Sequence, residues 1–237
     1  MKKIETCLSP MLLPVYALNQ KIAVVVDVFR ATSTIAAGLH AGIAAILPVA
    51  TIAEAQAHQA QGYLAAAERN GQTVAGFDLG NSPLAFLSEN LRQKTIVLTT
   101  TNGTKCLNEC LGAQEIICGS FVNLQACVDY LHQKNCGVII VCAGWKDSPS
   151  LEDTLFAGAL VQKMAEKNYE IADDASLMAA NIYEQAKGNI TEYLKNSSHY
   201  KRLQQHGTDA DLVYCTSYNT APVVPIYTQN KLITHIF

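Results

Sequence analysis

The strongest constraint on the fold of this chain is a set of apolar runs in which polar residues do not alternate with apolar ones. A strand with two apolar faces must be covered on both sides, as in the parallel sheet of an α/β protein. The clearest runs are residues 22–26, 43–49, 95–98 and 138–142, and weaker strand candidates are residues 115–118 and 212–215. The chain is therefore expected to build a sheet buried between two layers.

Segments with helical character alternate with these runs. The expected helices cover residues 32–41, 52–61, 105–110, 124–133, 151–167, 174–187 and 190–205. This alternation predicts a three-layer α/β/α architecture with a mainly parallel sheet, in which ligands bind outside the carboxyl ends of the strands. We expect one unit over residues 1–237, and a composition shift near Lys134-Asn135 is the one candidate boundary between two subdomains.

Composition excludes several classes of protein. With 16% charged and 49% hydrophobic residues, the chain can bury a large core and is not expected to be disordered. Its net charge of −3 gives no basic footprint for nucleic acid. No apolar run approaches the roughly 18 residues of a membrane span, and Met1-Lys2-Lys3 is not followed by the apolar core of a signal peptide. We therefore expect neither a nucleic-acid partner nor a membrane partner.

The eight cysteines favour a cytoplasmic location. None of them form a CxxC pair, and several lie inside apolar runs, as in Val141-Cys142-Ala143. Such thiols are expected to be reduced and mostly buried, without disulfides or zinc. The sequence does not define the oligomeric state, and a homodimer is the hypothesis.

A group of polar residues follows the run at residues 22–26. Asp27 comes first, then Arg30, and Thr32-Ser33-Thr34 stand at the start of an expected helix. A carboxylate at the end of a buried strand is costly to leave unpaired, so a metal ion or Arg30 is its expected partner. The guanidinium, the hydroxyls and the positive end of the helix suit an anion. The structural alternative is that Asp27 only caps the helix.

A second polar segment, residues 99–104, follows the third run. It holds four threonines, Asn102 and Gly103 before another expected helix. Hydroxyls, an amide and a glycine that permits a left-handed turn can together cradle an oxyanion. A helix cap followed by a turn is the alternative interpretation. A Walker loop is excluded because GxxxxGK[ST] is absent.

The loop at residues 76–83 also has two interpretations. Two glycines, an asparagine and a proline make it a tight turn, which can place Asp78, Asn81 and Ser82 around a ligand or can be purely structural. Glu68-Arg69, judged from the residues alone, is expected to be an exposed ion pair at a helix end.

The last acidic group precedes and begins the expected helix at residues 151–167. Ser150 can cap this helix, with Asp153 in the capping-box position. The functional alternative is that Glu152 or Asp153 ligates a hard cation. Mg²⁺ favours carboxylates together with waters and phosphate oxygens.

Motifs of several other hydrolase families are absent. The Cys-x5-Arg loop of cysteine phosphatases does not occur, nor do GxGxxG, HExxH and GxSxG. Asp27 is similar to the first acid of the haloacid-dehalogenase motif DxDx[TV], but Phe29 stands where that motif has its second acid. This departure argues against an aspartyl-phosphate mechanism with that pair of acids.

Together these segments resemble the 2-phosphosulfolactate phosphatase family. The matching pieces are residues 27–34, Glu68-Arg69, residues 76–83, Thr101-Asn102-Gly103-Thr104, Cys142-Ala143-Gly144, Glu152-Asp153, Ser198-His199, Leu203, Gly207, Asp211-Leu212 and Val224-Pro225. The likeness spans residues 22–225. Each motif is weak alone, but their order and joint presence are specific. One departure is Ala67, because a glycine is expected directly before Glu68.

The resemblance implies a magnesium-dependent phosphatase for a small anionic substrate. The implied reaction converts (R)-2-phospho-3-sulfolactate to 3-sulfolactate and phosphate, a step toward coenzyme M. Two alternatives stay open: a phosphatase for another small phosphorylated organic acid, and a non-catalytic anion-binding module. The attacking group is either a metal-activated water or a side chain.

The resemblance also suggests a role for each site residue. The expected catalytic residues are Asp27, Arg30, Glu68 and His199. The expected Mg²⁺ ligands are Asp27 with one or more of Glu68, Glu152 and Asp153. The expected substrate-binding residues are Arg30, Thr32, Ser33, Thr34, Arg69, Asn81, Ser82, Thr101, Asn102, Gly103 and Thr104. His199 would protonate the leaving alkoxide, and the alternative is a surface histidine on a polar helix.

Overall fold

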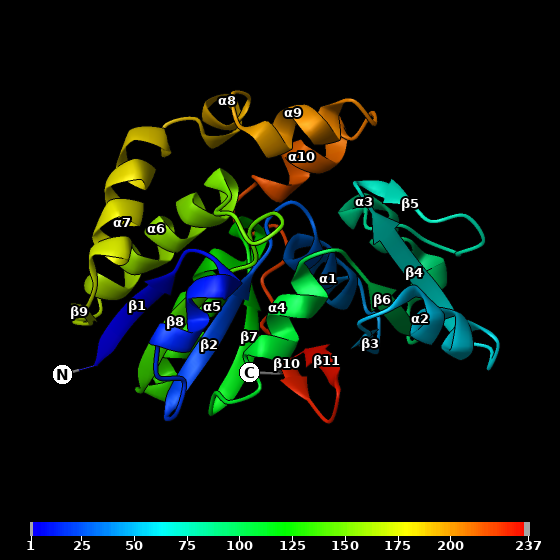
Figure 1. Ribbon diagram of the computed structural model, residues 1–237, viewed down its shortest axis with the longest axis horizontal. Helices are drawn as coiled ribbons and strands as arrows, with labels where there is room; N and C mark the ends of the chain where they lie inside the picture. Colours follow the sequence, from blue (N-terminus) through cyan, green and yellow to red (C-terminus); the bar gives the residue numbers. More distant parts are fainter. Residues whose placement is uncertain (1, 235–237) are drawn as a thin grey trace.

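A buried sheet forms the centre of the molecule (Figure 1). The computed structural model describes residues 2–234. The strands are β1 (Lys3–Cys7), β2 (Lys21–Val26), β3 (Ala45–Pro48), β4 (Leu64–Arg69), β5 (Gln72–Thr73), β6 (Thr95–Thr99), β7 (Glu115–Gly119), β8 (Gly137–Cys142), β9 (Glu170–Ile171), β10 (Pro225–Thr228) and β11 (Lys231–Thr234). In the described chain their order is β5-β4-β6-β3-β11-β10-β7-β2-β8-β1-β9.

Most neighbouring strands run parallel, which confirms the expected mainly parallel sheet. Strand β2 pairs in parallel with β7 and β8, and β6 pairs in parallel with β3 and β4. The hairpin β10–β11 lies between these two groups and pairs antiparallel with β7 on one side and β3 on the other. The end of the chain therefore joins the two parallel parts of the sheet, which the strand candidates did not reveal.

Helices cover both faces of the sheet, so the predicted three layers are confirmed. The α-helices are α1 (Ala31–His40), α2 (Ile52–Gln59), α3 (Pro83–Phe86), α4 (Gly103–Glu109), α5 (Leu124–Lys134), α6 (Leu151–Ala165), α7 (Asp174–Ala186), α8 (Ile190–Leu194), α9 (Ser198–Gln204) and α10 (Asp209–Cys215). Short 3-10 helices are η1 (Pro10–Val15), η2 (Glu89–Leu91) and η3 (Phe121–Asn123). Val24 and Val26 of β2 pack in one core with α5 and α6, whereas Ala23 and Val25 pack in a second core with α1 and α4.

Two expected elements are wrong. Residues 212–215 are the end of helix α10, not a strand. Leu212 and Cys215 are buried while Val213 between them is 54% exposed, so the apolar spacing is that of a helix face. The expected helix at residues 190–205 is interrupted, because the Ser197 hydroxyl accepts the N–H of Tyr200 and starts α9 as a new helix.

Strand β4 was not expected. Its sequence, Leu64-Ala65-Ala66-Ala67-Glu68-Arg69, has high intrinsic helix propensity. Parallel pairing with β6 overrides that propensity, and Ala65, Ala66 and Ala67 are completely buried. Glu68 therefore lies near the carboxyl end of a buried strand that is second from the edge of the sheet.

The cysteines, the lengths of the helices and the subdomain boundary were also subjects of prediction. All eight cysteines are free thiols, and seven of them are buried, as expected. None of the described helices has the length and apolar character needed to cross a bilayer. The candidate subdomain boundary near Lys134 falls at the end of α5 and stays a prediction.

The last helices position one wall of the site. Helices α8, α9 and α10 extend from α7 across the carboxyl edge of the sheet toward α3 and β5 (Figure 1). Helix α10 packs against both α3 and α9. This arm brings residues 190–215 over the ends of strands that lie far away in the sequence.

Candidate active site

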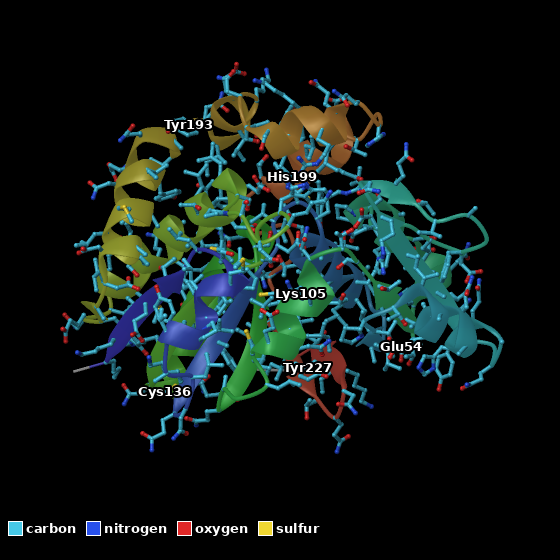
Figure 2. The ribbon with its side chains drawn as sticks, viewed as in Figure 1. Glu54, Lys105, Cys136, Tyr193, His199 and Tyr227 are labelled. Carbon is cyan, nitrogen blue, oxygen red and sulfur yellow. The ribbon has the colours of Figure 1, made fainter. Side chains whose placement is uncertain are left out.

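The predicted site residues lie at the carboxyl ends of the parallel strands. Asp27 follows β2, Glu68 ends β4 with Arg69, and Thr101 follows β6. His199, on α9, lies on the side of that helix that faces the sheet (Figure 2). These are the positions at which α/β sheets bind their ligands.

A buried cavity brings six of the predicted residues together. Its volume is about 10 Å³, which leaves room for about one water molecule between the side chains. The predicted residues in its wall are Asp27, Arg30, Glu68, Asn81, Asn102 and His199, and the wall is completed by Phe29, Gly71, Trp145 and Leu203. An open groove of about 620 Å³, which also contains Ser82, shares Arg30, Gly71 and Asn81 with the cavity.

Asp27 is held by the tight junction between β2 and α1. Its backbone N–H donates to the Thr32 hydroxyl at 3.0 Å, and the N–H of Thr32 donates back to its carbonyl at 3.0 Å. Oδ1 accepts the N–H of Ala31 at 3.4 Å, so the carboxylate does contact the helix start, as the capping alternative predicts. Oδ2 faces Gly103 at the start of α4. The junction therefore both caps the helix and directs the acid toward the cavity.

Four carboxyl groups repel one another around this junction. Burial, followed by the charges of Asp153 and Glu68, raises the pKa of Asp27 well above its usual value. Burial and the charge of Glu152 raise the pKa of Asp153 to about 7. A cation or a bound proton is required to relieve this repulsion.

The donor set fits a magnesium ion that shares its coordination with a phosphate. Glu152 Oε2 is buried without a hydrogen-bond partner among the described residues. Within residues 2–234, no three His, Cys, Asp or Glu side chains are grouped closely enough to hold a metal ion by themselves. Mg²⁺ does not require such a cage, because it binds through one or two carboxylates with waters and substrate phosphates. The cofactor stays a prediction.

The buried acids predict an unusual pH dependence of stability. Because the folded-state pKa values of Asp27 and Asp153 are raised, the folded protein binds more protons than the unfolded chain, and stability falls as the pH rises from about 4 to about 7. We expect denaturation in EDTA to show this fall in the free energy of unfolding, and Mg²⁺ to reverse it at pH 7 but not at pH 4. A Mg²⁺ effect of equal size at both pH values would contradict the interpretation.

Arg30 is buried and already paired with protein groups. Nη1 donates to Asp211 Oδ2 at 2.6 Å, and Nη2 donates to the Gly71 carbonyl at 2.9 Å. Asp211 Oδ1 in turn accepts the Ser82 hydroxyl at 2.7 Å. Asp211 was not predicted as a site residue, although its motif contributed to the family resemblance. It orients Arg30 in the cavity wall and links α10 to the loop before α3.

The three hydroxyls after Arg30 lie inside the packing of α1. Thr32 bonds to the backbone of Asp27, Ser33 donates to the Val28 carbonyl at 2.8 Å, and Thr34 donates to the Asn81 carbonyl at 3.3 Å. All three side chains are buried, and none of them lines the cavity. Their role in substrate binding stays a prediction.

Glu68 and Arg69 do not form the expected exposed ion pair at a helix end. Glu68 is buried, and its carboxylate accepts the N–H of Gly71 and contacts the Thr101 hydroxyl at 3.3 Å. Arg69 donates to the Glu68 carbonyl at 2.6 Å and to the Thr99 hydroxyl at 3.0 Å. The pair therefore stabilises the end of β4, with only Glu68 in the cavity wall.

The segment from Thr101 to Thr104 is divided between two sides of α4. Asn102 lines the cavity, while Thr101 and Thr104 line a separate surface pocket. The Thr104 hydroxyl donates to the Thr100 carbonyl at 3.1 Å. Whether the segment cradles an anion stays a prediction.

Gly103 lies where a side chain has no room. An added Cβ would lie 2.7 Å from the Ala31 Cβ and 2.9 Å from Asp27 Oδ2. We expect Gly103→Ala to lower the free energy of unfolding by about 1–3 kcal/mol through overpacking and to displace Asp27. Gly188→Ala is the matched control, because nothing lies within 4 Å of its added Cβ. Equal melting temperatures of the two variants would show that the α1–α4 contact is not tight.

The capping-box interpretation of Ser150 and Asp153 is wrong. Ser150 is the N-cap residue of α6 but its side chain makes no capping hydrogen bond. Asp153 Oδ1 accepts the N–H of Val28 at 2.8 Å, and Oδ2 accepts the N–H of Gly144 at 3.0 Å. Asp153 therefore ties the residues after β2 to the residues after β8.

His199 is a buried residue, not a surface histidine on a polar helix. Its side chain is 8% exposed, and Nδ1 lies 2.5 Å from Glu152 Oε1. Because Glu152 takes Nδ1, the other ring nitrogen, Nε2, is the one available for proton exchange in the cavity. The T-shaped contact with Phe29 further fixes the ring.

Two residues that were not predicted are Trp145, which lines the cavity, and Arg202, which contacts the Trp145 ring. The Trp145 ring lines the cavity, 5.5 Å from the His199 ring. The Arg202 guanidinium lies over the Trp145 ring, 3.9 Å from its centroid. The available signals were that Trp145 directly follows Ala143-Gly144 and that Arg202 is one helical turn after His199.

Fold and site together define an α/β protein with a group of buried acids, an arginine and a histidine at the carboxyl ends of its parallel strands. The family model described as 2-phosphosulpholactate phosphatase matches residues 7–230. The chain therefore belongs to the 2-phosphosulfolactate phosphatase family, whose activity is that of phosphoric monoester hydrolases.

Curated relatives agree with the family model along most of the chain. A protein of Thermotoga petrophila is 42% identical over 94% of this chain and 96% of its own length. A protein of Carboxydothermus hydrogenoformans is 42% identical over 87% of this chain and 86% of its own length. A protein of Caldanaerobacter subterraneus subsp. tengcongensis is 35% identical over 88% of each chain. Each is named probable 2-phosphosulfolactate phosphatase. The resemblance seen in the motifs is confirmed.

Proposed function

We propose that this enzyme hydrolyses (R)-2-phospho-3-sulfolactate to 3-sulfolactate and phosphate with the help of Mg²⁺. The observation that carries the proposal is the buried cavity, whose wall combines two acids, Asp27 and Glu68, with Arg30 and His199. The names of the relatives support the substrate. With this substrate, the reaction is a step of the coenzyme M biosynthesis type.

Asp27 and Glu68 are the proposed magnesium ligands, because both line the cavity. Contacts with Ala31 and Gly71 fix their carboxylates. Bound Mg²⁺ would neutralise charge on the phosphate oxygens and activate water. Glu152 is engaged by His199, and both oxygens of Asp153 accept backbone N–H groups. We therefore assign Asp153 to supporting the site, while Glu152, whose Oε2 has no partner among the described residues, is a further proposed ligand.

Arg30 and the asparagines are the proposed groups that position the substrate. Arg30 is held rigidly by Asp211 and Gly71, so its charge faces the cavity in a fixed orientation. Asn81 Oδ1 is buried without a hydrogen-bond partner among the described residues. Because this oxygen is an acceptor, Asn81 can take a hydrogen bond from a donor in the cavity, such as a water molecule.

Phosphate release from a panel of substrates tests the proposal. Purified enzyme is assayed with 2-phosphosulfolactate, 2-phospholactate, 3-phosphoglycerate and phosphoserine, each with Mg²⁺ and with EDTA. We expect the highest kcat/KM for 2-phosphosulfolactate and loss of turnover in EDTA that added Mg²⁺ restores. A higher kcat/KM for another phospho-acid would make that compound the assigned substrate in place of 2-phosphosulfolactate. Binding without phosphate release would favour an anion-binding module.

A cytoplasmic location is proposed as well. Eight free cysteines, seven of them buried, support a reducing compartment. The homodimer stays a prediction, which the mass of the purified protein by light scattering tests.

A further inference from the structure

The arginines near the cavity differ in how fully their terminal nitrogens are used. Both terminal nitrogens of Arg30 donate to protein groups, and so do both of Arg69. Nη2 of Arg202, in contrast, is buried without a hydrogen-bond partner among the described residues. A buried guanidinium N–H that lacks an acceptor is costly, so an acceptor is expected to arrive from outside the chain.

Helix α9 turns Arg202 toward the same region as two residues of the cavity wall. His199 and Leu203 both line the cavity, and Arg202 lies three residues after His199, so the two share one face of the helix. Arg202 is also close enough to Glu152 and Glu68 for their charges to act on it. Glu68 belongs to β4, on a different wall of the cavity. Arg202 therefore lies among the acids of the site and not on the outer surface of α9.

Trp145 holds the guanidinium in place without using its donors. The guanidinium carbon lies 3.9 Å from the ring centroid, within the range of a cation–π contact, and such a contact does not use the N–H donors. This differs from Arg30, which Asp211 fixes by a hydrogen-bonded ion pair. An arginine held only by its face is ready to form a two-pronged contact with an acid group.

We propose that Arg202, placed over Trp145, binds one of the two acid groups of the substrate that do not react, the sulfonate or the carboxylate. This inference rests on the proposed function, which supplies a substrate with a phosphate and two further acid groups. The phosphate is assigned to the side of Asp27 and Glu68. A planar guanidinium suits either the sulfonate or the carboxylate, and Arg202 thereby sets specificity for a doubly substituted phospho-acid over a simpler one.

Steady-state kinetics of Arg202→Gln and Arg202→Lys test the assignment. Lys201→Ala is the matched control, because Lys201 is the exposed neighbour on the same helix. We expect Arg202→Gln to raise KM for 2-phosphosulfolactate about 10–100-fold with kcat changed less than about 3-fold, and Arg202→Lys to recover part of the loss. Unchanged KM in both variants, with the control equal to wild type, would overturn the proposal.

Two truncated substrates identify the bound group. 2-Phospholactate lacks the sulfonate, and 1-sulfopropan-2-yl phosphate lacks the carboxylate. If Arg202 binds the sulfonate, Arg202→Gln and wild type have equal KM values for 2-phospholactate but different values for the second compound, and the reverse holds for the carboxylate. A KM change of the same size for both compounds would show that Arg202 does not contact either group specifically and would overturn the assignment.

A binding measurement separates this inference from the proposed function. Trp145 is the only tryptophan of the chain, so its fluorescence reports the Arg202 stack directly. We expect 3-sulfolactate to change the fluorescence of wild type, with a Kd that rises at least about 10-fold in Arg202→Gln. Failure of wild type to release phosphate would reject the proposed function, whereas an equal Kd in variant and wild type would reject the role of Arg202. Circular dichroism confirms that each variant is folded.

Discussion

Asp27→Asn is expected to abolish phosphatase turnover, with kcat at least about 10³-fold below wild type. Asparagine has nearly the same shape, and its oxygen can still accept the N–H of Ala31. What it removes is the negative charge that is proposed to hold Mg²⁺ beside the phosphate. The measurement is phosphate release from 2-phosphosulfolactate at saturating Mg²⁺, together with Mg²⁺ binding by calorimetry.

The stability of the same variant excludes unfolding as the cause. Because burial and neighbouring acids raise the pKa of Asp27, its charged form destabilises the folded state at neutral pH. Asp27→Asn should therefore melt at the same temperature as wild type in EDTA, or at a higher one. Asp129→Asn, an exposed acid on α5, is the control for removal of one charge. Wild-type turnover in Asp27→Asn would remove Asp27 from the metal site.

Strands were predicted correctly from the sequence where their side chains are large and β-branched. The runs that became β2, β6 and β8 are rich in Val and Ile, and both their faces are buried. Strand β4 was missed because three alanines carry no strand signal and only pairing with β6 defines it. The hairpin β10–β11 was missed for a related reason, since its place depends on β7 and β3, which are distant in sequence.

The candidate site was predictable where a polar residue follows a buried strand. Asp27 and Asn102 have this signal, and both line the cavity. Residues that reach the cavity from α9 and from the loop after β8 have no such signal, because tertiary packing alone brings them there. Trp145 and Arg202 therefore escaped the motif search. Similarly, Thr32 and its neighbours suggested an anion site by composition, but their hydroxyls are used within the fold.

His199→Gln is expected to lower kcat for 2-phosphosulfolactate by about 10²–10⁴-fold, with a small change in KM. The leaving group of this substrate is an alkoxide, which is a strong base and needs a proton as the ester bond breaks. Glu152 fixes Nδ1 of His199, which lines the cavity, so Nε2 is the nitrogen proposed to donate this proton. Glutamine keeps the polarity of the position but cannot exchange a proton with the substrate.

The leaving group provides the decisive comparison for His199. In p-nitrophenyl phosphate the departing phenolate is stable without protonation, so kcat of His199→Gln on that ester should fall less than about 10-fold. Glu152→Gln should also lower kcat more for 2-phosphosulfolactate than for p-nitrophenyl phosphate, but by a smaller factor than His199→Gln. The glutamine keeps a hydrogen bond to Nδ1 and loses only the charge that stabilises the protonated ring. Equal losses on both esters would mean that His199 orients the substrate without donating a proton. A contact that only positions the substrate acts before bond breaking, and it therefore cannot distinguish a strongly basic leaving group from a weakly basic one.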